Sequence, residues 1–395
     1  MPYIFDAIRT PRGKGRASRR CTTSSPWIWS QVSCRTLQAR HAGHGPDRRR
    51  HPGLRDARGR AGRGHRTHGR ALRGVGPGHA RYADQRFCAS GLEAVNLAAM
   101  KVRAGWEQLV VAGGVESMSR VPMGRDGGAL MDDPVVSDAI GFVPQGISAD
   151  LIATLEGFSR AELDAYAVRS QQRAARAHAE GRFRALVPVV DAAGAVLLDH
   201  DEHMRPQTTL EALAALPPAF VEAGRPASTQ RAPALPQVDA INHVHTAGNS
   251  SGIVDGARWC SWAARPRVRR WDCGHARILA AALVGAEPTI MLTGPAPATQ
   301  SAHPGRPGRG RSGRHRMQRG VCRRRAQVYA GHGTGERDRV NVNGGAIALG
   351  HPLGATGAVL LATALDELER SDGETALVTL CAGGGMGIAT IIERV

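Results

Sequence analysis

Three residues have side chains and neighbours that suit covalent catalysis: Cys88, His351 and Cys381. Cys88 lies two residues before Ser90-Gly91-Leu92-Glu93, a capping-box pattern that predicts an apolar helix running to about Arg103. A thiol at that place experiences the positive end of the helix dipole and unpaired backbone N–H groups, which favour the thiolate. The position predicts a nucleophile, and a small buried cysteine is the structural alternative.

His351 lies in a glycine-rich stretch, residues 341–357, that reads Asn-Val-Asn-Gly-Gly-Ala-Ile-Ala-Leu-Gly-His-Pro-Leu-Gly-Ala-Thr-Gly. The glycines let the backbone approach a ligand closely, and Pro352 stiffens the turn that presents the imidazole. Alone, such a histidine more often has a structural role. Beside a nucleophilic cysteine it is a candidate base, because the ordinary pKa of histidine lies close to neutral pH.

Cys381 ends a predicted strand and opens the turn Cys-Ala-Gly-Gly-Gly-Met-Gly at residues 381–387. A thiol at the end of a strand can donate and accept a proton, and the N–H groups of a glycine turn can bind a developing oxyanion. A phosphate-binding loop or a plain β-turn fits the same motif. The motif alone therefore does not decide between these roles.

The segments that carry these residues alternate strand and helix signals, which is typical of α/β folds. Strands are expected at residues 3–8, 108–112, 277–284, 375–380 and 388–392, and helices at residues 90–103 and 355–370. Residues 120–245 have the texture of loops with one strong helix, which begins at Ser159-x-x-Glu162 and ends at Gly181. The pattern predicts two similar α/β halves around a looser middle section.

Five segments together resemble the signature blocks of thiolases, in the family's order. They are the segments around Cys88, His351 and Cys381, the stretch Gly-Gly-Val-Glu-Ser-Met-Ser at 113–119, and the stretch His-Thr-Ala-Gly-Asn-Ser-Ser-Gly-Ile-Val-Asp-Gly-Ala at 245–257. The resemblance implies a thiolase-like α/β fold with two similar halves, each a mixed five-stranded sheet packed around central helices. It divides the chain into an N-terminal half at 1–120, a loop domain covering coenzyme A at 121–245, and a C-terminal half at 246–395.

The resemblance also implies a mechanism. Cys88, activated by His351, would accept an acyl group from a 3-ketoacyl-CoA, and Cys381 would protonate the departing acetyl-CoA carbanion. A second CoA would then release the shortened acyl chain, and the reverse reaction would be a Claisen condensation. The backbone N–H groups of Cys88 and Gly383 would form one oxyanion hole, His351 would contribute to another, and Ser251 would hydrogen-bond the pantetheine arm. Coenzyme A is then a substrate, no cofactor or metal is expected, and a covalent intermediate predicts ping-pong kinetics.

The 395-residue chain has a formal net charge of +18, and this charge is concentrated in three windows, residues 17–81, 258–276 and 301–339. The windows hold 31 of the 52 Lys and Arg residues and 5 of the 34 acidic residues, so the rest of the chain has a net charge of −8. They show neither strand alternation nor a helical period. We interpret them as products of a shifted reading frame that disrupts the N-terminal half and residues 258–340; arginine-rich disordered insertion is the alternative.

One catalytic part that the resemblance implies is missing. Thiolases carry an Asn-Glu-Ala-Phe block upstream of the Asn-Val-Asn-Gly-Gly stretch, and its Asn holds a water in the oxyanion hole shared with the histidine. No Asn lies between residues 301 and 340. The window 17–81 also replaces elements of the first half, and the lost burial would be large against a net stability of ~5–15 kcal/mol. We therefore expect a poorly folded or inactive polypeptide.

Other functions compete with this interpretation. An arginine-rich nucleic-acid-binding protein fits the charge, but the windows lack interleaved aromatics and a binding motif. Zinc binding is disfavoured because the chain has no CxxC pair. A ketoacyl synthase would pair its cysteine with two histidines, whereas Cys381 argues for a thiolase. The sequences of residues 248–256 and 201–206 look more like those of degradative 3-ketoacyl-CoA thiolases, which act in fatty-acid (β-oxidation) or related acyl-CoA breakdown. They look less like those of biosynthetic acetoacetyl-CoA thiolases.

The remaining sequence features bear on compartment and assembly. Outside the three windows only Cys88 and Cys381 remain, too few for a disulfide framework. No signal-peptide pattern and no run of about 18 apolar residues is present. We expect a cytoplasmic acyltransferase that uses acyl-CoA and CoA, binds neither nucleic acid nor a membrane, and assembles as a homodimer or homotetramer if it folds.

Overall fold

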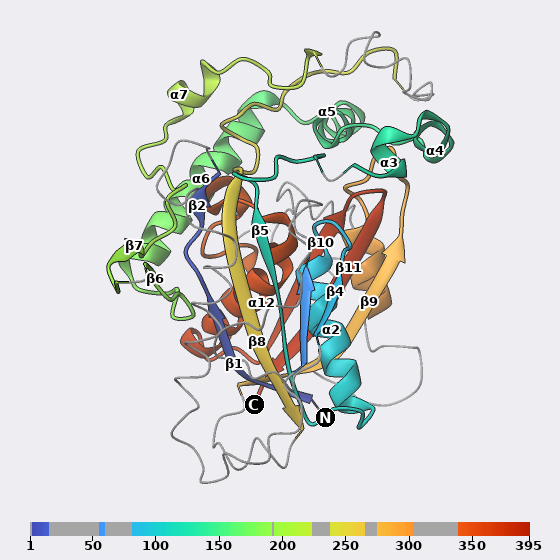
Figure 1. Ribbon diagram of the computed structural model, residues 1–395. Helices are drawn as coiled ribbons and strands as arrows, with labels where there is room; N and C mark the ends of the chain where they lie inside the picture. The colour runs from blue at the N-terminus through green and yellow to red at the C-terminus, as the bar shows by residue number, and fades with distance from the viewer. Residues whose placement is uncertain are drawn as a thin grey trace, which may run out of the picture.

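The computed structural model describes residues 2–15, 55–59, 81–125, 127–191, 193–222, 238–264, 275–302 and 339–395. Within these ranges, the side chains of residues 55–59, 81–83 and 259–264 are not described. Most of the three arginine-rich windows therefore lies outside the described residues. Figure 1 shows the arrangement of the elements, with the two chain ends close together at the lower end of the molecule.

Five neighbouring strands of one nine-stranded sheet form its mixed part, in the order β4-β3-β5-β8-β1. They are β1 (Pro2–Arg9), β3 (Arg55–Gly59), β4 (Arg81–Asp84), β5 (Leu109–Ser117) and β8 (Val254–Ala264), and the short β2 (Gly13–Lys14) pairs with β8. Strand β3 is parallel to β4 and β5, whereas β8 is antiparallel to β5 and β1. This is the mixed five-stranded sheet expected for the N-terminal half.

Three antiparallel strands form the second layer, in the order β10-β11-β9. They are β9 (Ala276–Gly285), β10 (Thr375–Ala382) and β11 (Met386–Arg394). A short pairing of Tyr3 with Arg277 and Ile4 with Ala276 joins this layer to β1. The family resemblance implied a mixed sheet of five strands for this half, whereas the described residues show three antiparallel strands. Residues 303–338 lie outside the described residues.

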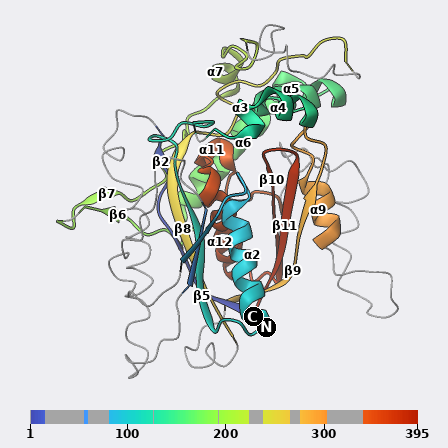
Figure 2. The same ribbon diagram turned by 45° about the vertical axis from the view of Figure 1, so that its right-hand side comes forward.

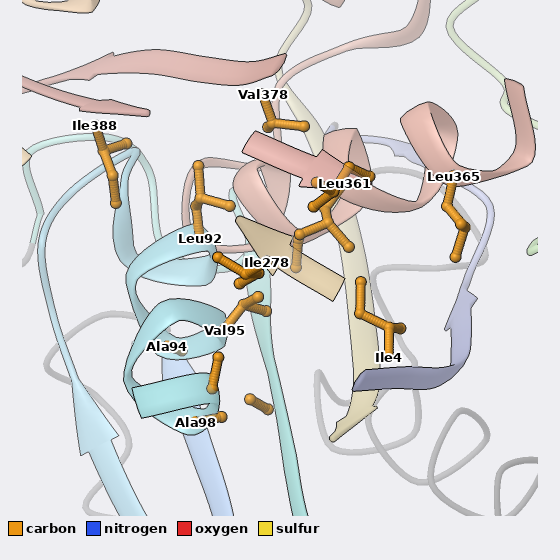
Figure 3. Packing of buried hydrophobic residues seen from close by; sticks show 14 of the residues in the cluster. Ile4, Leu92, Ala94, Val95, Ala98, Ile278, Leu361, Leu365, Val378 and Ile388 are labelled. Carbon is orange, nitrogen blue, oxygen red and sulfur yellow. The ribbon is translucent and has the colours of Figure 1, made fainter. Parts of the chain in front are cut away.

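Two helices, α2 (Ser90–Arg103) and α12 (Leu353–Arg370), lie between the two strand layers (Figure 2). Their apolar faces meet the strands in one core, part of which is drawn in Figure 3: Ile4, Leu92, Val95, Ile278, Leu361, Leu365, Val378 and Ile388. Glycine lets the helices approach closely, since a Cβ on Gly91 would lie 2.6 Å from the carbonyl oxygen of Gly354. The start of α2 is thereby fixed against the start of α12.

The middle section lies mostly over one end of these layers, at the top of Figure 1, while its hairpin of β6 and β7 lies part-way down the left side. It contains α3 (Ala129–Asp132), α4 (Pro134–Ile140), α5 (Gln145–Glu156), α6 (Arg160–Ala179), α7 (Leu210–Ala214) and the hairpin β6 (Val189–Val190) and β7 (Val196–Leu198). Helix α6 begins with the predicted capping box, in which both the Ser159 and the Glu162 hydrogen bonds are present. Gly181, just past its end, has a φ of +64°.

One apolar stretch of the middle section, Pro134–Glu156, is by length and composition able to cross a membrane. Gly141, with a φ of +71°, divides it into α4 and α5, because a left-handed residue ends a helix. Helix α5 then buries Ile147 and Leu151 in the protein. These contacts account for the apolar residues of α5 as packing of the middle section.

Two strands occupy positions where the composition predicted none. Strand β3 lies inside the window 17–81, and β8 extends to Ala264, inside the window 258–276. The backbone of β8 is paired with β1 on one side and β5 on the other, and ladder hydrogen bonds do not depend on side-chain type. The disruption expected for 258–276 thus does not extend to the backbone of 258–264. Although β8 falls in the range assigned to the C-terminal half, it adds to the N-terminal sheet.

Candidate active site

Cys88 lies in a tight turn between β4 and α2, with 8% of its surface exposed. Phe87, directly before it, has a φ of +47°, a strained value for a bulky residue. The hydroxyl of Ser90 holds this turn, because it accepts a hydrogen bond from the N–H of Arg86 at 2.8 Å and donates one to the carbonyl of Phe87 at 2.7 Å. Backbone strain of this kind is concentrated at functional sites.

The capping box predicted for α2 is wrong. The N-cap residue is Ala89, which makes no side-chain hydrogen bond, and Ser90 is the first residue of the helix. Its hydroxyl is engaged by the turn, and the carboxylate of Glu93 pairs with Arg86 at 3.7 Å instead. The same residues therefore shape the turn that presents Cys88.

The environment of Cys88 makes the thiol a weaker acid. Burial raises its pKa above the ordinary value, and the nearby Cys381 and Glu116 raise this pKa further. The thiolate expected from the helix dipole is thus not the resting form, because desolvation outweighs the dipole. A base must take the proton as the sulfur attacks.

The sequence predicts His351 as this base. Its backbone N–H donates to the carbonyl of Gly252 at 2.9 Å, and its imidazole Nδ1 lies 2.6 Å from the hydroxyl oxygen of Thr356. Burial lowers the pKa of His351 to about 4, and the positive charge of Arg12 acts in the same direction. The near-neutral pKa expected from the sequence is therefore corrected downward. The imidazole is uncharged at neutral pH, the form that can accept a proton.

Cys381 lies near the end of β10, is 2% exposed, and packs with Met291 and Leu292. The glycine turn that follows it reaches the turn before Cys88, since a Cβ on Gly383 would lie 3.1 Å from the ring of Phe87. The effect of Cys381 on the pKa of Cys88 places the two sulfurs within electrostatic range of each other.

Glu116, near the end of β5, connects these parts. Its carboxylate accepts the backbone N–H of Gly354 at 3.1 Å, in the first turn of α12, and its charge acts on Cys88. Together with the contact between Gly91 and Gly354, this places Cys88 and His351 at adjoining helix starts. The structure brings the three predicted catalytic residues and Gly383 to one end of the central helices.

Ser251, the predicted CoA-binding residue, is exposed beside this site. Its neighbour Gly252 donates its N–H to the carbonyl of Ala346 at 3.2 Å and accepts that of His351. A Cβ on Gly252 would lie 2.2 Å from the imidazole of His203. This side chain of the middle section therefore packs against the backbone of Gly252. Ser251 is held close to the His351 loop.

Several polar residues of the site escaped sequence reasoning. Glu116 lies in the stretch 113–119 and Thr356 in the stretch 341–357. The sequence feature that could have identified them is a polar side chain among small residues. Asp201 lies in the stretch 201–206, for which the sequence predicts no role in the site. Its carboxylate binds the buried Arg9 through both oxygens, at 2.8 and 2.9 Å, and Arg12 at 3.2 Å. This pairing anchors the strand and loop beside His351. Among the described residues, no group of three His, Cys, Asp or Glu side chains is placed to hold a metal ion.

Comparison with known proteins assigns the chain to a family. The family "Thiolase, N-terminal domain" matches residues 65–233, and "Thiolase, C-terminal domain" matches residues 326–394. A β-ketoadipyl-CoA thiolase of Pseudomonas aeruginosa is 37% identical over 343 residues, covering 78% of each chain. This chain belongs to the thiolase family. The predicted family, α/β fold and acyl-transfer function are confirmed, and the comparisons give the nucleic-acid-binding alternative no support.

Further relatives agree with this assignment. A 3-oxoadipyl-CoA/3-oxo-5,6-dehydrosuberyl-CoA thiolase of Escherichia coli is 37% identical over 340 residues, covering 78% of both chains. The crystal structure of the Bacillus anthracis acetyl-CoA acetyltransferase is similar with a TM-score of 0.77 at 27% identity, covering 100% of this chain and 98% of that one. Human mitochondrial 3-ketoacyl-CoA thiolase is similar with a TM-score of 0.76. This thiolase is thus an acyltransferase that acts on acyl-CoA and CoA.

Proposed function

We propose that this thiolase is active, against the inactivity expected from its arginine-rich windows, and that it transfers acyl groups through a thioester on Cys88, with His351 as the base and Cys381 as the second acid. One observation carries the proposal: a protonated, buried thiol and an uncharged imidazole lie at adjoining helix starts, with the Cys381 turn packed against the turn before Cys88. A neutral pair of this kind can exchange one proton as the thiol attacks a carbonyl.

In the cleavage direction, the sulfur of Cys88 attacks the C3 carbonyl of a 3-oxoacyl-CoA while its proton moves to His351. The N–H groups of Cys88 and Gly383 support the oxyanion. The C2–C3 bond then breaks, the shortened acyl group stays on Cys88, and the C2 carbanion takes a proton from Cys381 to leave as acetyl-CoA. A second CoA thiol gives its proton to the Cys381 thiolate and attacks the thioester, and Cys88 takes back the proton held by His351 as the acyl-CoA leaves.

We propose a substrate with a carboxylate at its far end. The support is that relatives at 37% identity are named for β-ketoadipyl-CoA and 3-oxoadipyl-CoA. The alternative is a fatty-acyl substrate, which the sequences of residues 248–256 and 201–206 favour. Thiolysis of 3-oxoadipyl-CoA and of 3-oxohexanoyl-CoA separates them, since both acyl groups have six carbons. We expect kcat/KM to be at least about tenfold higher for 3-oxoadipyl-CoA, and a preference for 3-oxohexanoyl-CoA would support the fatty-acid alternative.

Cytoplasmic location and a homodimeric or homotetrameric assembly are part of the same proposal. Their support is the sequence: two cysteines outside the arginine-rich windows and the family resemblance. Light scattering coupled to size-exclusion chromatography measures the assembly, and a monomer that cleaves 3-oxoacyl-CoA would contradict it.

Steady-state thiolysis tests the acyl-enzyme itself. Double-reciprocal plots at several CoA concentrations should be parallel, as ping-pong kinetics require. Because residues 301–340 lack the Asn that the family resemblance implies, we expect carbon–carbon cleavage to be slowed more than acyl exchange between two CoA thiols. Intersecting plots, or thiolysis by a Cys88→Ala protein at the wild-type rate, would refute the proposed mechanism.

A further inference from the structure

The imidazole of His351 and the hydroxyl of Thr356 make a short, buried contact. Thr356 lies in the first turn of α12 with 6% of its surface exposed. Its Oγ1 is 2.6 Å from Nδ1 of His351 and 2.9 Å from the carbonyl oxygen of Pro352. That carbonyl also accepts the backbone N–H of Thr356 at 2.9 Å.

The positions of the protons follow from the chemistry of these three atoms. A carbonyl oxygen can only accept, and a threonine hydroxyl has a single hydrogen. If the hydroxyl hydrogen pointed to Nδ1, Oγ1 and the Pro352 oxygen would face each other at 2.9 Å without a hydrogen between them. If it points to the carbonyl, Oγ1 accepts from an Nδ1–H, and both short contacts are hydrogen bonds.

We propose that Thr356 is a positioning residue that holds neutral His351 as the Nδ1–H tautomer, so that Nε2 is the atom that takes the proton of Cys88. The inference rests on the proposed function, in which His351 is the base. A neutral imidazole has one N–H, so fixing it on Nδ1 leaves the lone pair of Nε2 free. The partner of one ring nitrogen thereby decides the role of the other.

The surroundings of His351 keep the ring uncharged, as this role requires. Arg12 is the charged group that acts on the imidazole, and its positive charge opposes protonation. The backbone of His351 is fixed by the Gly252 carbonyl on one side and by Pro352, the N-cap of α12, on the other. With the backbone held in this way, the contact between Nδ1 and the hydroxyl of Thr356 sets the tautomer.

Removing the hydroxyl at constant shape tests the inference. Thr356→Val leaves Nδ1–H without its acceptor and lets the ring adopt the Nε2–H form, which cannot accept the proton. A general base contributes about 10²- to 10⁴-fold, and we expect acylation of Cys88 by acetyl-CoA to slow by about 10- to 100-fold. Thr356→Ser keeps the hydroxyl and should restore most of the rate.

A second threonine of the same helix provides the control. The hydroxyl of Thr363, two turns further along α12, donates to the Val359 carbonyl at 3.1 Å. This is the same kind of hydrogen bond, to the carbonyl four residues earlier, that Thr356 makes to Pro352. Thr363→Val should therefore match the effect of Thr356→Val on helix stability and leave acylation unchanged. If both variants slowed acylation equally, the effect would belong to the helix and the inference would be overturned.

Nitrogen NMR of ¹⁵N-histidine-labelled full-length protein reads the tautomer directly, with His351 assigned from the spectrum of His351→Gln. We expect protonated Nδ1 and bare Nε2 in the wild type, and a shift toward Nε2–H in Thr356→Val. A wild-type spectrum with the proton on Nε2 overturns the inference even if Thr356→Val does not fold. His351→Gln acylating at the wild-type rate is a different failure, because it removes the base from the proposed function.

Discussion

The three largest influences on the sulfur of Cys88, which are burial, Cys381 and Glu116, oppose its ionisation, and a backbone hydrogen bond acts weakly in the other direction. Because its pKa is raised, the thiolate fraction stays small at neutral pH and grows as the pH rises past the ordinary range of a thiol. In the proposed mechanism, nucleophilicity then depends on proton transfer to His351, whose pKa of about 4 keeps it neutral above that pH. The mechanism therefore requires the two groups to act as a pair at neutral pH.

Glu116→Gln tests this electrostatic balance. Glutamine keeps a carbonyl oxygen for the N–H of Gly354 but removes the negative charge, so the pKa of Cys88 should fall. Iodoacetamide alkylation of Cys88 at pH 8, followed on its peptide by mass spectrometry, should accelerate roughly threefold to tenfold. The exposed Glu374→Gln is the control, and a slower or unchanged reaction in Glu116→Gln would show that the carboxylate does not act on this thiol.

At the scale of elements, β1 and β8 place two fully buried arginines beside each other in the sheet with different surroundings. Arg9 is paired with Asp201, whereas none of the three guanidinium nitrogens of Arg258 has a hydrogen-bond partner among the described residues. A buried charge without partners is costly, while a buried pair loses heavily when one member is removed. Arg258 is also the first residue of the window 258–276.

The two arginines should therefore respond oppositely to truncation. We expect Arg258→Ala to raise the free energy of unfolding by about 1–3 kcal/mol, and Arg9→Ala to lower it by about 3–5 kcal/mol because Asp201 loses its partner. Burial raises the pKa of Asp366 to about 6 although the charge of Arg258 opposes this rise, so Asp366 can protonate when Arg258 is removed. Urea unfolding measures both changes, and a loss of stability in Arg258→Ala would contradict this account of β8.

Helix α12 is held against β5 through glycine. A Cβ on Gly114 would lie 1.8 Å from the carbonyl oxygen of Gly354, so Gly114→Ala must displace the first turn of α12 and with it His351. We expect the free energy of unfolding to fall by about 3 kcal/mol or more. The rate of Cys88 acylation should fall by more than the loss of folded protein accounts for. Gly285→Ala in β9, where nothing lies within 4 Å of an added Cβ, is the matched control. Equal stability of the two variants would show that the contact is not required.

The sequence predicted the elements well where the pattern is local. Strands near 3–8 and 375–380 and the helix at 159–181 follow from periodicity and caps, and the structure places them within a few residues. The capping box at Ser90 failed because the turn just before the helix engages its hydroxyl. The pKa values of Cys88 and His351 could not be predicted, since both depend on burial by segments distant in the sequence.

At the scale of the whole molecule, the arginine-rich windows differ in composition from the segments that resemble thiolases. The two family matches start at residues 65 and 326, inside two of these windows, and leave out residues 1–64 and 234–325. The reading-frame hypothesis stays a prediction. It implies that a mildly acidic thiolase has been altered in the windows while its core blocks remain.

Resequencing and retranslating the gene tests that hypothesis. The other frames across 17–81 and 301–339 should restore acidic, helix- and strand-patterned thiolase segments, including the Asn-Glu-Ala-Phe block. The restored chain should unfold cooperatively at a higher temperature in calorimetry than the present one, because it regains buried apolar surface. Windows that read as arginine-rich in the verified gene, in a chain that melts sharply and cleaves 3-oxoacyl-CoA, would support genuine insertions instead.

The acyl-enzyme on Cys88 is the central claim, and mass spectrometry after mixing with labelled acetyl-CoA tests it most directly. We predict that the wild-type peptide containing Cys88 gains one acetyl group, that His351→Gln gains it far more slowly, and that Cys88→Ala gains none. Label taken up by Cys88→Ala, or found on Cys381 in the wild type while Cys88 stays free, would contradict the account.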